Sequence, residues 1–210
     1  MTRLMLGIDP GLQCTGWGLV SQSGQQLHHI AHGTVRTNSA FSDALRLREI
    51  HDGLAEVVSQ WQPHAAAIET IFVARGAASA IKLGMARGVA MQLCSGAGLS
   101  LVEVAARQVK KAVTGTGKAD KKQVQAMVNR LLNIQSRGAD AADALAIAIA
   151  ALNQGGLGSG AAQAGRDQAG RDQAGRDQSG RDQAGRDQSG RGLAAAIEAA
   201  LAREEQGGRR

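Results

Sequence analysis

A five-residue repeat near the carboxyl end of the chain limits how much of the sequence can enter a hydrophobic core. The unit, Ala-Gly-Arg-Asp-Gln or Ser-Gly-Arg-Asp-Gln, recurs in five copies from Ala164 to Gln188 and contains no large apolar residue. A period of five fits neither a helix nor a strand, and a glycine in every unit adds entropic cost that no burial offsets. We therefore predict a fold within residues 1–155, a disordered linker over 156–192, and a short amphipathic helix with a basic end over 193–210.

The first 155 residues combine short apolar segments with longer helical patterns. Three segments come first and are separated by Pro-Gly and Ser-Gly, which favours an antiparallel meander; they are residues 4–9, 14–21 and 26–35. The later patterns predict strands at 65–69 and 99–104 and helices at 45–61, 77–94, around Val109, 121–132 and 139–152. Three strands followed by alternating helices and strands indicate an α/β fold with a mixed sheet flanked by helices.

Charge and hydropathy favour an anionic binding partner over a membrane. The formal net charge is +6, and every lysine lies before residue 123, so the surface suits an anionic partner such as nucleic acid. No stretch approaches the ~18 to 20 uninterrupted apolar residues of a membrane span. Cys14 and Cys94 lie far apart in a chain that shows no signal peptide, and we expect a cytoplasmic protein with no membrane association.

Two of the predicted strands end in a carboxylate. Asp9 follows the apolar run 4–8, and Glu69 follows the apolar run 65–68. Each acid alone has an ordinary interpretation, because an Asp before Pro-Gly starts turns and a strand end is often solvated. If the two strands are parallel neighbours, both acids lie at the edge of the sheet where α/β proteins form their sites.

Asp140 and Asp143 stand at the start of the last helical pattern, where their spacing of three residues puts both on one face of the first turn. Acids also occur at helix starts as caps and as partners of the helix dipole. Four carboxylates brought together repel one another, and oxygen ligands without Cys or His favour Mg²⁺ or Mn²⁺. Two such ions could activate a water and stabilise the leaving oxygen of a phosphodiester. The combination predicts hydrolysis of a nucleic-acid backbone.

Five short motifs cover about the first 152 residues. They are Gly-Ile-Asp-Pro-Gly at 7–11, Ile-Glu-Thr-Ile-Phe at 68–72, Lys-Leu-Gly-Met-Ala-Arg-Gly at 82–88, Ala-Arg-Gln-Val-Lys at 106–110, and the alanine-rich segment 139–149. In their residues and their order along the chain they resemble the signatures of the RuvC family of Holliday junction resolvases. The resemblance implies an RNase H-like fold, a homodimer, a RuvA–RuvB branch-migration complex as partner, and Mg²⁺-dependent paired nicking of four-way DNA junctions in recombination and repair. It assigns two Mg²⁺ ions, replaceable by Mn²⁺, to Asp9, Glu69, Asp140 and Asp143.

The resemblance also implies a DNA-binding surface. Phe72 lies three residues beyond Glu69, and the matching aromatic residue in the family stacks on or unpairs bases, where stacking is worth about 1–3 kcal/mol. Lys110 and Lys121 match basic positions that help to hold the scissile phosphate, and neighbouring lysines attract phosphate generally. The residues that we assign to DNA binding are Phe72, Arg75, Lys110, Lys118, Lys121 and Lys122.

Three other functions remain open at this point. Another RNase H-like nuclease would use the same four acids without a preference for junctions. An actin-like ATPase or sugar kinase can also carry Gly-Ile-Asp in its first strand, although this chain is short and has no second phosphate loop. A non-catalytic DNA-binding module would need none of the acids. Comparing cleavage of a four-way junction and a matched linear duplex, with and without Mg²⁺, separates these functions.

Overall fold

The structure is a computed structural model that describes residues 2–70, 76–136 and 138–154. The predicted linker and the terminal helix lie outside the described residues, as do Phe72 and Arg75. Within the described part of the chain, no helix is long and apolar enough to cross a membrane.

The described residues form the strands and helices that the sequence predicts, with bounds shifted by one or two residues at most. The strands are β1 (Arg3–Asp9), β2 (Cys14–Ser23), β3 (Gln26–Arg36), β4 (Ala65–Glu69) and β5 (Ser100–Val104). The helices are α1 (Asp43–Trp61), α2 (Ala77–Gly96), α3 (Ala106–Thr114), α4 (Lys121–Leu132) and α5 (Ala139–Asn153). Apolar periodicity therefore located each element correctly.

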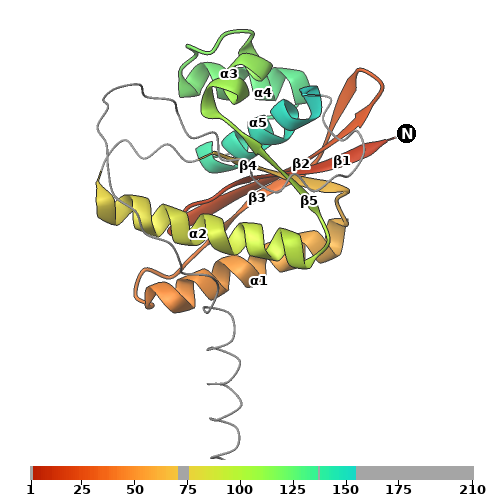
Figure 1. Cartoon of the computed structure of the whole chain (residues 1–210). Helices are drawn as coiled ribbons and strands as arrows, with labels where there is room; N and C mark the ends of the chain where they lie inside the picture. The colour runs from red at the N-terminus through yellow and green to blue at the C-terminus, as the bar shows by residue number, and fades with distance from the viewer. Residues whose placement is uncertain (1, 71–75, 137, 155–210) are drawn as a thin grey trace, which may run out of the picture. The chain divides into compact units, whose positions relative to one another are not determined.

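The strands form one mixed sheet in the order β3-β2-β1-β4-β5 (Figure 1). β1, β2 and β3 pair antiparallel as the predicted meander, whereas β4 pairs parallel with both β1 and β5. Ile8 pairs with Ile68, so the strands carrying Asp9 and Glu69 end side by side at one edge of the sheet. The sheet and its flanking helices confirm the expected RNase H-like architecture.

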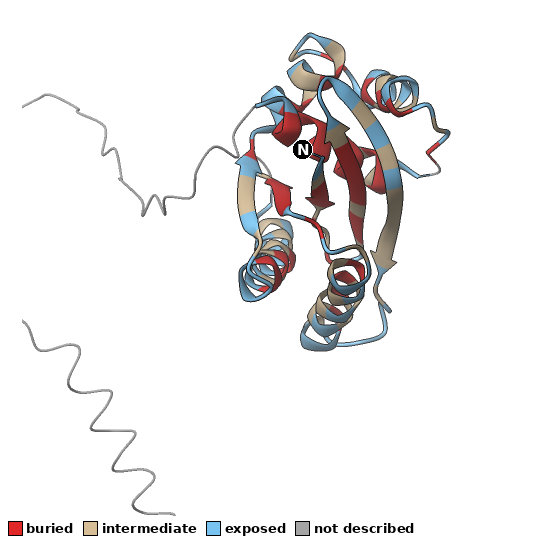
Figure 2. Cartoon of the chain, turned by 90° about the vertical axis from the view of Figure 1, so that its right-hand side faces the viewer, coloured by how far each residue is buried: buried red, intermediate tan, exposed pale blue. Residues whose placement is uncertain are grey.

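Helices cover both faces of the sheet, with α1 and α2 on one face and α3, α4 and α5 on the other (Figures 1 and 2). The alternation of side chains along a strand divides the core between these two layers. In β4, Ala65 and Ala67 pack toward α5, whereas Ala66 and Ile68 pack toward α1 and α2. The same alternation turns the next side chain, that of Glu69, toward α5.

Helix α5 lies directly on the sheet over two glycines. A Cβ on Gly7 would stand 2.0 Å from the main-chain oxygen of Ala144, and a Cβ on Gly16 would stand 2.1 Å from that of Asp140. Both contacts are with the helix backbone, so only glycine permits this approach. The approach brings the first turn of α5 over the ends of β1 and β2.

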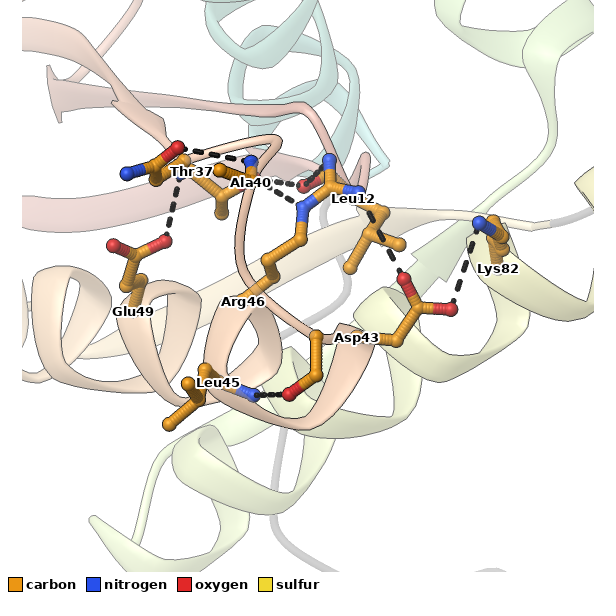
Figure 3. A network of polar contacts seen from close by, with 10 residues as sticks. Leu12, Thr37, Ala40, Asp43, Leu45, Arg46, Glu49 and Lys82 are labelled. Atoms are coloured by element: carbon orange, nitrogen blue, oxygen red, sulfur yellow. Dashed lines mark hydrogen bonds and ion pairs between the residues drawn. The ribbon is translucent and has the colours of Figure 1, made fainter.

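A buried arginine holds the turn that follows Asp9 (Figure 3). The side chain of Arg46, in α1, is 8% exposed and forms an ion pair with Asp43 at 3.8 Å. Its guanidinium donates to the main-chain oxygen of Leu12 at 3.2 Å and to Oγ1 of Thr37 at 3.0 Å. The Thr37 hydroxyl donates to the same Leu12 oxygen at 2.6 Å. Arg46 therefore ties α1 to the β1–β2 turn.

Replacement of this arginine is expected to lower the stability of the fold. Arg46→Met removes the donors to Leu12 and Thr37 and leaves their oxygens without these partners, which should cost about 2–3 kcal/mol in the free energy of unfolding. Urea unfolding measures the loss. Arg48→Met is the matched control, because Arg48 and its partner Asp52 are 78% and 58% exposed and such pairs contribute little. Equal unfolding midpoints for the two variants would contradict this role for Arg46.

Candidate active site

Asp9 lies at the end of β1, and its side chain points to the α5 side of the sheet because alternate residues Met5 and Gly7 face α5. The pKa of this carboxyl is raised to about 7, chiefly by burial and then by the negative charges of Asp143 and Glu69. The turn after Asp9 is closed by Thr15, whose hydroxyl donates to the main-chain oxygen of Gly11 at 2.9 Å.

Glu69 lies at the end of β4, beside Asp9. Burial is the main cause that raises the pKa of its carboxyl, followed by the charge of Asp143. The charges of Lys121 and Lys110 act in the opposite direction. Glu69 is therefore half-buried among charged groups of both signs, unlike the solvated strand end that its position alone allows.

The first turn of α5 supplies the other two acids. Gly138 occupies the N-cap with φ 100°, so neither aspartate caps the helix. Asp143 Oδ2 lies 3.0 Å from the ammonium of Lys121. Asp140 contributes to the raised pKa of Asp9 and, after burial, to the raised pKa of the Cys14 thiol. The two acids thus face the ends of β1 and β2.

Three of the four acids line one pocket of about 140 Å³ together with both lysines that match family positions. Its charged lining residues are Asp9, Glu69, Asp143, Lys110 and Lys121. Its apolar wall is formed by Ala106, Val109, Val124 and Ile147. Asp140 stands beside the pocket without lining it. Lys118 and Lys122 are exposed near the start of α4, outside the lining.

The chemistry of this lining fits a hard divalent cation, because its acidic donors are all carboxylate oxygens and it contains no Cys or His. As the side chains stand, no three acidic, His or Cys residues in the described ranges are close enough together to hold a metal ion. The Lys121 ammonium supplies the positive charge next to Asp143 instead. Three or more of these carboxylates could share one metal ion only after their side chains move closer together.

Two residues near the acids were not predicted from the sequence to belong to the site. Cys14 begins β2 next to Asp140, and Arg87 in α2 donates to the main-chain oxygen of Glu69 at 3.2 Å. Arg87 lies within the motif at 82–88, but the periodicity of α2 gives no indication that one of its side chains reaches the end of β4. Asp9 pairs with Gly16, so Cys14, two residues earlier in β2, lies near the same edge of the sheet, which only the strand register reveals.

Comparisons with known proteins give consistent results. The family profile described as crossover junction endodeoxyribonuclease RuvC matches residues 5–151. The RuvC of Zymomonas mobilis is 52% identical over 147 residues, which cover 70% of this chain and 88% of that protein. The structure of T. thermophilus RuvC in complex with Holliday junction substrate superposes with a TM-score of 0.67 at 32% identity, over 70% of this chain and 92% of that one. The yeast mitochondrial Holliday junction resolvase shares the fold, with a TM-score of 0.51 at 13% identity over 70% of this chain and 77% of that one.

Proposed function

Because the chain belongs to the RuvC family of crossover junction endodeoxyribonucleases, we propose that it resolves four-way DNA junctions in recombination and repair by metal-dependent hydrolysis of phosphodiester bonds. The observation that carries this proposal is the buried carboxyl of Asp9, which faces Asp143 and Glu69 across one small pocket. A cluster of partly buried acids is unfavourable in isolation and becomes favourable when a cation binds it. The clustered acids therefore lower the stability of the fold unless a positively charged ligand binds them.

We assign the metal as Mg²⁺, two ions per site and replaceable by Mn²⁺, with Asp9, Glu69, Asp140 and Asp143 as ligands. Carboxylates without thiol or imidazole partners favour these hard cations. When bound, the ions supply Lewis-acid activation of a water and charge stabilisation at the leaving oxygen. The position of Asp140 beside the pocket suits a ligand that enters the cluster as the acids draw together.

Lysines on the same side of the sheet provide the phosphate contacts. Lys110 and Lys121 line the pocket, so a phosphate that enters it meets two ammonium groups, and the Lys121 ammonium can exchange Asp143 for phosphate. Lys118 and Lys122 are exposed nearby and would hold flanking phosphates by charge alone.

We also retain Phe72 and Arg75, which lie outside the described residues, as DNA contacts. Substitution of Phe72 or of Arg75 by Ala should weaken junction binding in a mobility-shift assay.

The alternative is an RNase H-like nuclease without a preference for junctions. A synthetic four-way junction and a linear duplex with the same arm sequence, incubated with the protein and Mg²⁺, distinguish the two functions. We expect paired nicks in the junction and little cutting of the duplex. Equal cutting of both substrates would favour the alternative, and no cutting of either would contradict the nuclease itself.

We propose that the enzyme acts as a homodimer through the outer side of α2. Ile81 and Met85 are 63% and 38% exposed there, one helical turn apart. A Cβ on Gly84 or Gly88 would meet nothing within 4 Å, so these glycines leave room for the backbone of a second helix. A second copy of the chain is the occupant that fits, because paired nicking of two strands requires two active sites.

Ile81→Asp is expected to convert the dimer to a monomer, because it places a charge where the apolar face would be buried. Analytical ultracentrifugation measures the change in mass. Ile30→Asp is the matched control, since Ile30 is 37% exposed on β3, away from α2. A dimeric Ile81→Asp variant would exclude this face as the interface.

Three further assignments complete the proposal. A RuvA–RuvB branch-migration complex on the same junction is the partner, which co-elution of the proteins on junction DNA tests. Residues 1–155 are the nuclease domain, so a chain truncated after residue 155 should still cut junctions. The cytoplasm, where a DNA substrate would be met, is the compartment, and cell fractionation tests it.

A further inference from the structure

Arg87 reaches the end of β4 from the face of the sheet opposite the acids. Its Nε donates to the main-chain oxygen of Glu69 at 3.2 Å. Its Nη1 lies 3.0 Å from the sulfur of Met91, and its Nη2 donates to the carboxylate of Glu103. The Arg87 side chain is only 15% exposed. All three groups of this guanidinium that can donate therefore have a defined partner.

These contacts join the carboxyl ends of two strands. Glu103 lies in β5 and pairs across the sheet with Ile68 of β4, so both side chains face α2. The guanidinium thus holds a main-chain atom of β4 and a side chain of β5 together. An arginine has a planar, rigid set of donors, and it fixes such an arrangement more firmly than a lysine would.

The peptide unit between Glu69 and Thr70 is held on both sides. Its carbonyl oxygen accepts from Arg87, and its N–H, that of Thr70, donates to the main-chain oxygen of Val104 at 2.9 Å. The orientation of this peptide plane sets the direction in which the Cα–Cβ bond of Glu69 leaves the strand. The carboxylate of Glu69 lines the pocket on the opposite face.

We propose that Arg87 is a positioning residue, which aims the carboxylate of Glu69 at the metal by fixing the peptide unit that follows it. Arg87 contacts the main-chain oxygen of Glu69 and not its carboxylate, and Glu103 balances its charge. Its contribution is therefore geometric. This inference rests on the proposed role of Glu69 as a metal ligand, and the experiment separates the two.

Mn²⁺ affinity, measured by calorimetry on the full-length protein without DNA, is the primary readout. Arg87→Met should weaken Mn²⁺ binding about tenfold, the scale expected for loss of a group that orients a ligand. Arg87→Lys should lose less, because the ammonium can still donate to the main-chain oxygen of Glu69. In junction cleavage, kcat should fall at limiting Mn²⁺ and recover at high Mn²⁺, whereas KM for the junction stays within about twofold. Arg3→Met is the matched control, since Arg3 is exposed at the opposite end of β1.

Glu69→Gln, alone and combined with Arg87→Met, completes the design. If Arg87 acts through Glu69, the double variant binds Mn²⁺ no more weakly than Glu69→Gln. The positioning role would be overturned if the loss of Mn²⁺ affinity in the double variant equals the product of the losses in the two single variants. It would also be overturned if Arg87→Met binds Mn²⁺ as Arg3→Met does. Unchanged Mn²⁺ affinity in Glu69→Gln would instead overturn the ligand assignment of Glu69. If Arg87→Met does not fold, Arg87→Lys is judged by the same criteria.

Discussion

Asp9→Asn is expected to reduce the rate of junction cleavage by about 10³-fold or more. The amide keeps the shape of the side chain but cannot carry the negative charge that attracts and holds the metal. Loss of several kcal/mol of stabilisation at the reacting phosphate corresponds to a decrease of this size. Single-turnover cleavage of a labelled four-way junction at saturating enzyme measures it. Glu56→Gln, an acid-to-amide change on the exposed side of α1, should cleave at the wild-type rate.

Binding of the junction separates this effect from a loss of affinity. Asp9 is an acid within the proposed DNA-binding surface, so its replacement should remove a repulsion with phosphate, and affinity without metal should stay equal or increase. A variant that neither binds nor cuts would indicate that Asp9 is needed for the fold. A variant that cuts at the wild-type rate would exclude Asp9 from the site.

The same substitution should stabilise the protein without metal. The pKa of Asp9 is raised to about 7 in the folded state from about 3.9 in an unfolded chain, so stability is lost as the pH rises from about 4 to 7. A shift of three units corresponds to at most about 4 kcal/mol, and screening by solvent reduces this to about 1–2 kcal/mol. Asn avoids this loss, so the variant should have the higher Tm at pH 8. The difference should vanish below pH 4 and reverse when Mg²⁺ stabilises the wild type alone.

Gly7→Ala is expected to disrupt the packing of α5 on the sheet. The added methyl would lie 2.0 Å from the main-chain oxygen of Ala144 and 2.7 Å from the main-chain nitrogen of Ala148. Neither contact can be relieved by a side-chain rotation, so the whole helix must move. We expect a loss of about 3 kcal/mol or more in the free energy of unfolding. Because α5 carries Asp140 and Asp143, cleavage should fall together with stability.

Urea unfolding and cleavage of the same preparations test this prediction. Gly96→Ala is the matched control, because its Cβ would approach only a side-chain nitrogen of Gln92 at 4.0 Å. That variant should be as stable as the wild type, or slightly more stable, because alanine favours a helix over glycine. An unchanged urea midpoint in Gly7→Ala would show that α5 does not need glycine beneath it.

Local patterns in the sequence were sufficient to predict the strands and the helices, but left the parallel pairing that brings Asp9 beside Glu69 as a condition, which the structure meets. They were not sufficient for contacts between distant segments. Arg87 and Glu69 are 18 residues apart in different elements, and a periodic pattern reports only which face of one element is apolar. The sequence also did not identify Gly138 as the N-cap of α5, because two aspartates near the start of a helix give the same sequence pattern whether or not one of them is the N-cap.

The placement of Lys121 was the least predictable feature of the site. Sequence similarity to family motifs suggested a phosphate contact, but not an ammonium 3.0 Å from Asp143. A lysine at the start of a helix has no local pattern that distinguishes a solvated side chain from one that reaches a neighbouring helix. The positive charge of Lys121 offsets the negative charge of the clustered acids only because β1, β4, α4 and α5 pack together, and local sequence patterns do not report this packing.

We propose that the four acids act as one metal site, and direct binding of Mn²⁺ tests this most simply. Calorimetry would compare the wild type with Asp9→Asn, Glu69→Gln, Asp140→Asn and Asp143→Asn, with Glu56→Gln as control. We predict that each of the four changes weakens Mn²⁺ binding by at least about tenfold and that the control does not. Wild-type affinity in all four variants, or no Mn²⁺ binding by the wild type, would contradict the claim.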